Sequence, residues 1–326
     1  MIATSRRAIL AAAALALAIG ACAGMPEPVR ESHVAGQAIS ITLLHVNDSH
    51  GQLEPESTGG YARLATLVND LRSASASRRV FLVHCGDEFS RGDLLTRQTR
   101  GAANVTLMNH VGFDIWTPGN GEFYDGVANL QARIQQAQFP VLAANVRLQS
   151  TGQYLSRPYV IERAGPVRVA FFGLCFVRSG HPSAKPLQLA DALETARALV
   201  PQLRKQADLV VAVTHLGFRE DLRLAGEVPG IDLILGGHSH TVLPKGYLAR
   251  TPDRQVLICQ AGDKLRYLGQ VELKLTEQGE GYRLLSAEAK LIPIDQKVKI
   301  DSEVTALIAR LSAAAERPRG LPAPTK

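Results

Sequence analysis

The sequence predicts an α/β protein in which helices lie outside a layered β-sheet core. Apolar, β-branched runs of strand length alternate along the chain with segments whose apolar residues recur at helical spacing. With 326 residues, of which 46% are hydrophobic and 5% aromatic, the chain can bury the core of one large domain. Short polar clusters follow several of the strand-like runs, where open α/β sheets place their binding sites. Together these observations predict an α/β sandwich with a functional site at the carboxyl ends of its strands.

The first half of the chain alternates predicted strands and helices. In the first predicted helix, Leu64, Leu67, Val68 and Leu71 fall on one face. We expect strands at 39–46, 80–83, 114–117 and 140–145, and helices at 61–71, 101–111 and 126–138.

A predicted hairpin opens the second half, with strands at 158–163 and 167–177 separated by Ala164, Gly165 and Pro166. The later elements follow the same alternation and end in an amphipathic helix. They are a helix at 190–206, strands at 208–213 and 231–235, mostly β structure at 255–294 with turns at Gly262 and 278–281, and a final helix at 301–316.

The first residues indicate an export signal. Arg6 and Arg7 precede an apolar stretch, 8–19, that is too short to cross a bilayer as a permanent helix. The tetrad Ile19-Gly20-Ala21-Cys22 then resembles a bacterial lipobox, in which the cysteine becomes the lipidated first residue. We therefore expect an exported, periplasmic lipoprotein that is anchored to a membrane by lipid on Cys22. The alternative is a plain secretory signal and a soluble periplasmic protein.

These observations divide the chain into four parts. Residues 1–21 form the predicted lipoprotein-type signal peptide, and 22–37 form a tether rich in Pro, Gly and charge. Residues 38–295 form the folded domain, and 296–326 form a C-terminal helix with a frayed tail. The sequence does not indicate an oligomeric state.

Charge and cysteine content exclude two classes of protein. The net charge of +6 is mild and no basic run is interleaved with aromatic residues, so we expect no nucleic-acid polymer as a partner. Four cysteines in a chain of this length do not form a disulfide scaffold. Cys175 and Cys259 lie in apolar runs and are expected to be buried thiols. Cys85, two residues before Asp87, leaves thiolate ligation of a metal open as the less favoured alternative.

Five polar clusters supply the donor types of a metal site. They follow predicted strands and read Asp48-Ser49-His50, Gly86-Asp87, Gly119-Asn120, Thr214-His215 and Gly236-Gly237-His238-Ser239-His240. Residues two apart at a strand end point to the same side, so each paired cluster can converge on one point. Carboxylate, imidazole and amide groups are ligands of zinc, manganese and iron. A lone His, or an Asp beside Gly, is more often a loop or turn residue, so it is the complete set that indicates a two-metal site.

The other histidines outside these clusters are expected to have structural roles. His45 alternates in phase with Leu43, away from the Asp48 side of the strand end. The members of this group are His33, His45, His84, His110 and His181.

The polar clusters lie within longer motifs that resemble the calcineurin-like metallophosphoesterases, and specifically the bacterial and animal 5′-nucleotidase branch. The motifs are LHVNDSHGQLEP at 44–55, GGYARLATL at 59–67, VHCGDEFSRGDL at 83–94, GNGEFYDG at 119–126, LAANV at 142–146, VTHLG at 213–217 and GGHSHT at 236–241. They occur in the family's order and spacing over about residues 40–294. The resemblance implies a four-layer αββα sandwich of the metallophosphoesterase type, with 38–295 as the metallophosphoesterase domain.

The resemblance also implies a cofactor and a role for each ligand. The cofactor would be two divalent metal ions, Mn, Zn or Fe, which activate a hydroxide for in-line attack on phosphorus. The expected partner is a small anionic ester, namely a phosphomonoester, with nucleotides among the candidates. The seven ligands would be Asp48, His50 and His240 for the first ion, Asn120, His215 and His238 for the second, and Asp87 between them.

One motif departs from the family pattern at a position that bears on catalysis. The family reads Gly-Asn-His-Glu-Phe-Asp, whose His, supported by the Asp, stabilises the transition state and assists the leaving oxygen. Here Gly121 occupies the His position and Tyr124 the Asp position, with a carboxylate displaced to Asp125. Loss of a positioned acid typically costs about 10²- to 10⁴-fold in rate, so we expect a slow or specialised enzyme. The catalytic acid therefore stays unassigned, with Tyr124, Asp125, His84 and His110 as candidates.

The departure leaves two alternatives to a phosphoesterase. The first is a catalytically silent lipoprotein that binds metal or an anion. The second is a hydrolase of sulfur esters, since the thiosulfohydrolases of this fold also vary the same motif. The family's C-terminal domain, which stacks the nucleobase, has no counterpart before the chain ends, so no residue supports nucleotide specificity.

Overall fold

Two β-sheets pack face to face in the part of the chain that the structure, a computed structural model, describes. That part comprises residues 38–54, 58–75, 79–89, 92–251 and 254–316. The predicted signal peptide, Cys22, the tether, His33 and the tail at 317–326 lie outside the described residues. Within those residues, no helix combines the length and the apolar character needed to cross a membrane.

The first sheet has five strands in the order β13-β12-β1-β2-β3. Its three strands β1, β2 and β3 are parallel, so their carboxyl ends meet at one edge of the sheet. On the other side of β1, β12 runs antiparallel to β1, and β13 runs antiparallel to β12. The strands are β1 (Ile39–Val46), β2 (Arg79–His84), β3 (Ile115–Trp116), β12 (Tyr267–Gln278) and β13 (Gly281–Pro293).

The second sheet has six strands in the order β10-β11-β9-β8-β6-β5. Its four central strands are parallel, while β10 and β5 close the two edges as antiparallel neighbours. The strands are β5 (Tyr159–Ala164), β6 (Val167–Cys175), β8 (Leu209–His215), β9 (Leu233–Leu235), β10 (Tyr247–Arg250) and β11 (Gln255–Cys259). A separate pair is formed by β4 (Val146–Leu148) and β7 (Leu187–Leu189).

The contact between the two sheets is an apolar layer of alternate side chains. Ile41 and Leu43 of β1 point into it, while Leu44 and Val46 point to the opposite face, where helices cover the sheet. Phe81 of β2 meets a partner from the second sheet, Phe171, with ring centroids 5.3 Å apart at an angle of 61°. The strands are therefore buried on both faces, as their continuous apolar runs predict.

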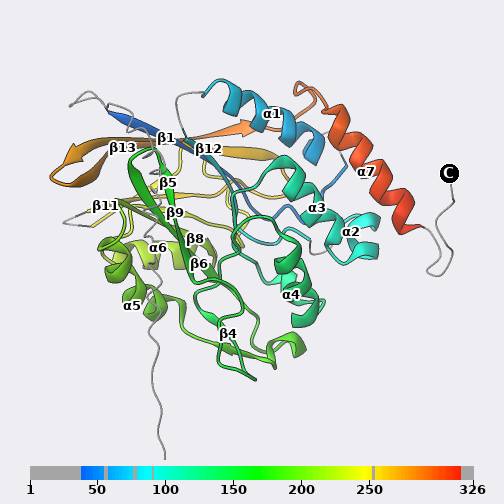
Figure 1. The fold of residues 1–326 in the computed structure, drawn as a ribbon, viewed down its shortest axis with the longest axis horizontal. Helices are drawn as coiled ribbons and strands as arrows, with labels where there is room; N and C mark the ends of the chain where they lie inside the picture. The colour runs from blue at the N-terminus through cyan, green and yellow to red at the C-terminus, as the bar shows by residue number, and fades with distance from the viewer. Residues whose placement is uncertain (1–37, 55–57, 76–78, 90–91, 252–253, 317–326) are drawn as a thin grey trace, which may run out of the picture. The chain divides into compact units, whose positions relative to one another are not determined.

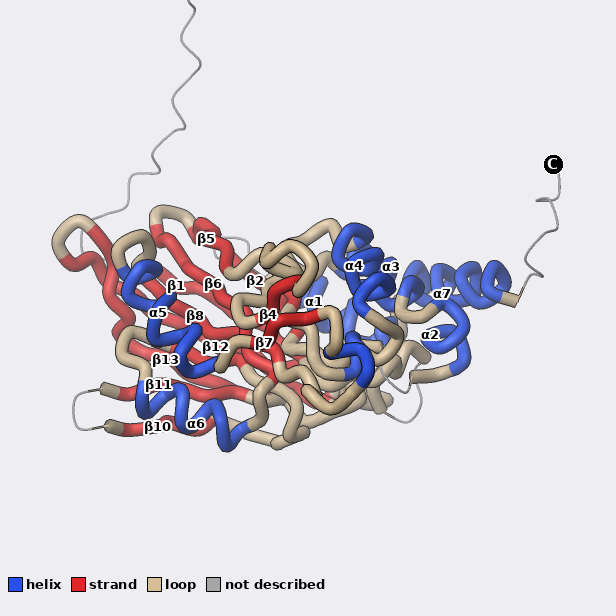
Figure 2. The backbone as a smooth tube through the Cα atoms, turned by 90° about the horizontal axis from the view of Figure 1, so that it is seen from below, coloured by secondary structure: helices blue, strands red, loops and turns tan. Residues whose placement is uncertain are grey.

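Helices cover the outer face of each sheet, which gives four layers. The helices α1, α3, α4 and α7 pack against the first sheet, and α5 and α6 pack against the second (Figure 1). Figure 2 shows α5 and α6 lying across the strands of the second sheet. The helices are α1 (Tyr61–Ser73), α2 (Leu94–Thr99), α3 (Ala102–Val111), α4 (Val127–Gln136), α5 (Ala192–Arg204), α6 (Phe218–Glu227) and α7 (Ser302–Ala315). The four-layer αββα class predicted from the sequence is confirmed.

Some elements escaped the sequence prediction. The amphipathic helix α6 reads FREDLRLAGE, and its few apolar residues and many charges hide the buried face formed by Leu224 and Ala225. The predicted strand at 140–145 forms only single bridges, from Val141 to Trp116 and from Leu142 to Arg157. The short 3₁₀ helices, η1 (Gly121–Phe123) and η2 (Pro182–Ala184), also carry no periodic signal.

Removing an aromatic ring from the layer between the sheets should destabilise the protein. Phe171 is fully buried against Phe81, so we expect Phe171→Ala to lower the free energy of unfolding by about 3–5 kcal/mol, as measured by urea denaturation. Leu285→Ala is the control, because that side chain is 51% exposed and its loss should change the free energy by less than about 0.5 kcal/mol. Equal losses in the two variants would contradict the proposed position of the core.

Candidate metal centre

The predicted ligands lie at the carboxyl ends of β1, β2, β3, β8 and β9, with His215 as the last residue of β8 and the other six on the loops that follow their strands. The parallel pairing of β1 with β2 sets Val46 opposite His84, so their two loops start side by side. Backbone hydrogen bonds then tie these loops together, from Asp48 N to Gly86 O and from His50 N to Asp87 O, both at 2.9 Å. The last loop is joined to the first by a 2.8 Å hydrogen bond from His238 N to Asp48 Oδ2. Loops far apart in the sequence are therefore held as one unit.

The ligand loops hold an unusual backbone conformation. Eight non-glycine residues in the described part of the chain have positive φ, and five of them are predicted ligands. An L-residue in this left-handed region costs about 1–2 kcal/mol, so the conformation persists only where the surroundings fix it. The five ligands, with φ between 50° and 76°, are Asp48, His50, Asp87, His238 and His240. Strain concentrated at these positions indicates a functional constraint on where their side chains point.

One group of donors gathers around Asp48. Its Oδ1 lies 3.3 Å from His240 Nε2 and 3.9 Å from His50 Nε2, and the two imidazole Nε2 atoms are 3.0 Å apart. These atoms lie close enough together to share one metal ion. The carboxylate of Asp263, 3.6 Å from His240 Nδ1, supports the far side of that ring, as carboxylates often do for metal-binding histidines.

A second group shares Asp48 with the first. His215 Nε2 lies 3.3 Å from Asp87 Oδ1 and 3.9 Å from Asp48 Oδ1, and these three side chains could hold another ion. The 2.7 Å contact from His215 Nδ1 to Cys85 O places the Nδ1 proton on the carbonyl side and leaves Nε2 as a ligand atom. Asp48 thus contributes to both groups, whereas the sequence assigned it to the first alone.

Asn120 and His238 border the second group. The ring of His238 packs edge-on against His215, with centroids 5.1 Å apart. Asn120 donates its Nδ2 proton to Tyr124 Oη at 2.9 Å, so the amide is oriented and its Oδ1 is kept for another partner. All seven predicted ligands therefore lie at one edge of the sheets.

Buried polar atoms without hydrogen bonds mark the same place. Asp48 Oδ1, Asn120 Oδ1 and His215 Nε2 are all buried and make no hydrogen bond. A buried polar atom left without a hydrogen bond is costly, and such atoms are rare in folded proteins. Three of them on predicted ligands fit a cation that would accept their lone pairs, so the residues present fit a metal centre.

The electrostatics of the cluster favour a positive charge. Asp48 and Asp87 are buried, with 0% and 4% exposure. Burial by itself would lower the pKa of His215, but the neighbouring Asp87, with help from Asp48, raises this pKa to about 10. The carboxylate pair therefore attracts a cation strongly enough to hold a proton on a fully buried imidazole, and divalent ions would meet the same demand.

Glycines allow the loops to approach this closely. A Cβ atom at Gly119 would lie 2.3 Å from Asp87 Oδ1 and 2.6 Å from His215 Nε2, which is closer than real Cβ atoms come. Gly86 has φ +86° and would place a Cβ 2.5 Å from His215 Nδ1. Both positions therefore require glycine.

Glu122 holds together the loops that carry Asp87 and Gly119. Its role was not recognised from the sequence. Its carboxylate is fully buried and accepts four backbone N–H groups, at 2.9, 2.6, 3.1 and 2.6 Å, from Asp87, Glu88, Phe89 and Gly119. Burial, followed by the charge of Asp87, raises the pKa of Glu122 to about 7. The sequence shows only that Glu122 lies between two ligand clusters. Its hydrogen bonds to backbone N–H groups depend on the fold and could not be predicted.

The histidines expected to be structural separate into different environments. His45 is buried against Gly269, and burial lowers its pKa to about 4. His84 is fully buried, with Nε2 at 2.7 Å from Ser49 Oγ and 2.8 Å from Glu88 Oε2. His110 is exposed in the last turn of α3. The Cys85 thiol has a pKa well above its usual value because it is buried, and its carbonyl, rather than its sulfur, meets His215.

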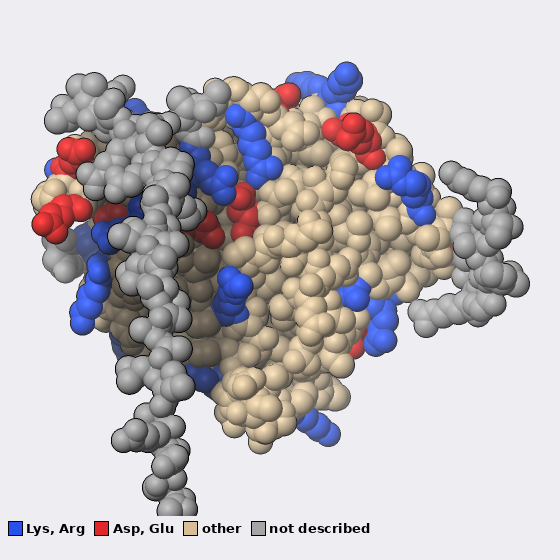
Figure 3. Space-filling model, viewed as in Figure 1, with Lys and Arg blue, Asp and Glu red and all other residues tan. Residues whose placement is uncertain are grey.

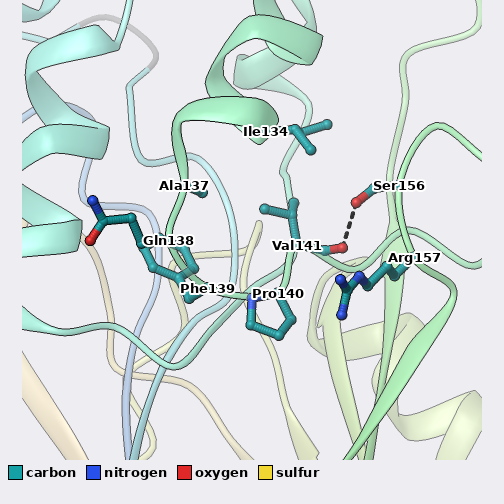
Figure 4. Close-up of a pocket in the computed structure, with 8 residues that line it drawn as sticks. All are labelled: Ile134, Ala137, Gln138, Phe139, Pro140, Val141, Ser156 and Arg157. Atoms are coloured by element: carbon teal, nitrogen blue, oxygen red, sulfur yellow. Dashed lines mark hydrogen bonds between the residues drawn. The ribbon is translucent and has the colours of Figure 1, made fainter.

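Two of the cavities on the described surface differ in whether they reach the predicted ligands. One, of about 420 Å³, adjoins the first ligand group, and its lining includes His50, His240, Gln52, Asp263 and Lys264. The other, of about 530 Å³, has none of the predicted ligands in its lining (Figure 4). It is lined by Ile134, Ala137, Gln138, Phe139, Pro140, Val141, Ser156 and Arg157. Of these two cavities, the first gives a small molecule access to the ligand cluster.

Surface charge is dispersed on the face shown in Figure 3. Lys and Arg side chains stand apart from one another there, and Asp and Glu lie among them. The described residues of this face form no continuous basic track of the kind that follows a nucleic-acid backbone.

Comparison with known proteins identifies the family. The sequence profile of the calcineurin-like phosphoesterases matches residues 41–242, which includes every predicted ligand. The chain belongs to the calcineurin-like phosphoesterase family. The resemblance stated from the motifs is confirmed, and this is a family of hydrolases that act on phosphate esters.

Two 5′-nucleotidases and a sulfate thiohydrolase are similar to this chain over more than half of its length. A probable 5′-nucleotidase of Treponema pallidum is 33% identical over 230 residues, 64% of this chain and 38% of that protein. The 5′-nucleotidase precursor of Thermus thermophilus has a TM-score of 0.77 at 27% identity, covering 85% of this chain and 59% of its own. The sulfate thiohydrolase SoxB of the same organism has a TM-score of 0.73 at 22% identity, covering 84% and 60%, and shows the shared fold alone. The chain thus spans less than two thirds of each of these proteins.

Loss of one ligand should remove one metal ion. His240 belongs to the first ligand group only, so we expect His240→Ala to lower the bound divalent metal from about two ions per chain to about one. Metal analysis after loading with Mn or Zn and dialysis measures this content. His110→Ala, an exposed histidine of α3, should keep the wild-type content. An unchanged content in His240→Ala would show that this residue is no ligand.

Proposed function

We propose that this chain is an exported hydrolase of phosphate esters that works with two divalent metal ions, Mn, Zn or Fe. The observation that carries the proposal is the convergence of two buried carboxylates with imidazole and amide donors whose ligand atoms lack hydrogen bonds. The names of the 5′-nucleotidase relatives support phosphomonoesters, including nucleotides, as the substrate class.

The donor set divides between two ions. Asp48, His50 and His240 would hold one ion, and Asn120, His215 and His238 the other, with Asp87 between them. When bound, such a pair would supply a Lewis acid for the phosphate oxygens. It would also lower the pKa of bound water, so that a hydroxide is available near neutral pH.

The protein residues orient this chemistry and give access to it. Cys85 O fixes the His215 ring, and Tyr124 fixes the Asn120 amide. His240 is 42% exposed and borders the 420 Å³ cavity, so a small ester can reach the ligand cluster from solvent. The backbone N–H of Gly121 donates to Asp87 Oδ1 at 2.7 Å and holds that carboxylate in place.

A second candidate function is a silent metal- or anion-binding lipoprotein. Gly121 favours it, because glycine at this position provides no acid. Hydrolysis of a sulfur ester is the third candidate and rests on the fold shared with the sulfate thiohydrolase.

Turnover of a panel of esters by the metal-loaded protein tests the proposal. We expect hydrolysis of aryl phosphates and nucleoside monophosphates with Mn or Zn, and a loss of at least about 10²-fold in kcat/KM for Asp87→Asn, because the carboxylate between the ions loses its charge. Asp70→Asn, on the exposed part of α1, is the matched control and should retain wild-type activity. No turnover of phosphate esters or thiosulfate esters would favour the silent binder, and turnover of thiosulfate esters alone would favour the third candidate.

Lipid on Cys22 would anchor the exported protein to a membrane, with a soluble periplasmic protein as the alternative. In a bacterial host we expect the wild type in the membrane fraction, labelled by radioactive palmitate, and Cys22→Ser unlabelled. Cys259→Ser is the control and should remain labelled, because Cys259 is buried in β11. A wild-type protein that is exported but unlabelled and soluble would favour the alternative.

A further inference from the structure

Position 121 carries no side chain beside the predicted metal centre, because it is a glycine. Gly121 begins η1, and Tyr124 ends it with a hydrogen bond from its N–H to Gly121 O. Side chains three residues apart eclipse each other in a 3₁₀ helix, so Tyr124 lies on the face from which a side chain at position 121 would project. The Gly121 N–H donates to Asp87 Oδ1, so position 121 borders the cluster.

Tyr124 contacts a predicted ligand of the second group and also a histidine that is distant in the sequence. Its hydroxyl oxygen accepts a hydrogen bond from Asn120 Nδ2 at 2.9 Å. Its ring packs against His181, with centroids 4.7 Å apart at an angle of 46°. His181 therefore lies beside Tyr124, a residue that also contacts the predicted ligand Asn120, although more than fifty residues separate the two rings in the sequence.

His181 lies on a loop that passes the second ligand group. The loop leaves β6 at Phe176, whose ring packs against His238 with centroids 4.7 Å apart. Five residues later the chain reaches His181, just before η2. The loop between β6 and η2 thus contacts the His238 side and the Tyr124 side of the same group.

The ring of His181 is held so that one nitrogen stays available. Its Nδ1 accepts a hydrogen bond from Ser183 N–H at 3.3 Å and lies 2.8 Å from Ser183 Oγ, so both contacts of the ring engage Nδ1. In the described part of the chain no residue forms a hydrogen bond with Nε2. The ring is half-buried, so Nε2 can reach a small molecule from solvent.

The other candidates for the missing acid fit less well. His84 is fully buried and already bonded to Ser49 and Glu88. Asp125 is exposed and lies 4.0 Å from Arg100, with which it forms an ion pair. His110 is exposed in the last turn of α3. His181, by contrast, packs on Tyr124 and keeps Nε2 available.

We propose that His181 donates the proton to the leaving oxygen in place of the side chain missing at Gly121, and that Tyr124 positions His181. The inference rests on the proposed phosphoesterase function. As the oxygen of water bonds to phosphorus, that water gives up one proton to solvent, the P–O ester bond breaks and its electron pair stays on the leaving oxygen. That oxygen takes the Nε2 proton of the His181 imidazolium, so the products are an alcohol and phosphate. The ring then regains a proton from solvent.

Dependence on the leaving group tests this role, because a good leaving group departs without a proton. In the metal-loaded protein, we expect His181→Asn to lower kcat for an alkyl phosphate by about 10²- to 10⁴-fold, but kcat for 2,4-dinitrophenyl phosphate by less than about tenfold. Asp70→Asn, on the exposed part of α1, is the control and should leave both values unchanged. Equal losses on the two substrates, or no loss on either, would overturn the assignment.

A second variant separates positioning from proton donation. Tyr124→Phe keeps the ring that packs on His181, so we expect it to retain the wild-type ratio of kcat for the two substrates, whereas Tyr124→Ala should approach the ratio of His181→Asn. Gly121→His in the His181→Asn background should recover turnover of the alkyl phosphate, since it places an imidazole at position 121. A Tyr124→Ala variant that keeps the wild-type ratio of kcat for the two substrates would overturn the positioning role.

A crystal structure of the metal-loaded protein with an unreactive alkyl phosphonate gives a readout apart from activity. We expect His181 Nε2 within about 4 Å of the atom that replaces the ester oxygen. A phosphonate bound with its alkyl group away from His181 would overturn the assignment. Wild-type turnover that His181→Asn leaves intact overturns this inference alone, whereas a wild type without turnover overturns the proposed function as well.

Discussion

The burial of two carboxylates at one edge of the paired sheets is the constraint on which the rest of the structure depends. Asp48 and Asp87 lie almost fully out of solvent, where unpaired charge is costly. The surrounding architecture offsets this cost with backbone N–H donors, imidazole rings and room for cations. The left-handed backbone of five ligands shows that the loops accept local strain to keep these groups converged.

The sandwich itself explains why the loops can hold that position. Parallel strands in both sheets end at the same edge, and the apolar layer around Phe81 and Phe171 keeps the sheets together. The helices on the outer faces bury the opposite side of each strand, so the sheets form a rigid base. Rigid strands with strained loops at their ends suit a site that must be formed before its ligand arrives.

Hydrophobic pattern predicted the frame better than it predicted the details of the site. The predicted strand at 39–46 coincides with β1 because both of its faces are buried and its apolar run is unbroken. The α6 helix escaped prediction because most of its surface is charged. The motif residues indicated which side chains gather, but the sharing of Asp48 between two groups depends on distances in space. The contact of His181 with Tyr124 is likewise created by the fold, and sequence spacing gives no sign of it.

The four hydrogen bonds accepted by Glu122 have a consequence for how this enzyme can change over time. They hold the ligand loops through main-chain atoms. No side chain at position 121 is needed for that support, since this residue is glycine. Architecture and reactivity are therefore carried by adjacent but independent positions. A lineage can lose the side chain at 121 while its scaffold survives, and it can recruit a new reactive group from a neighbouring loop without rebuilding the protein.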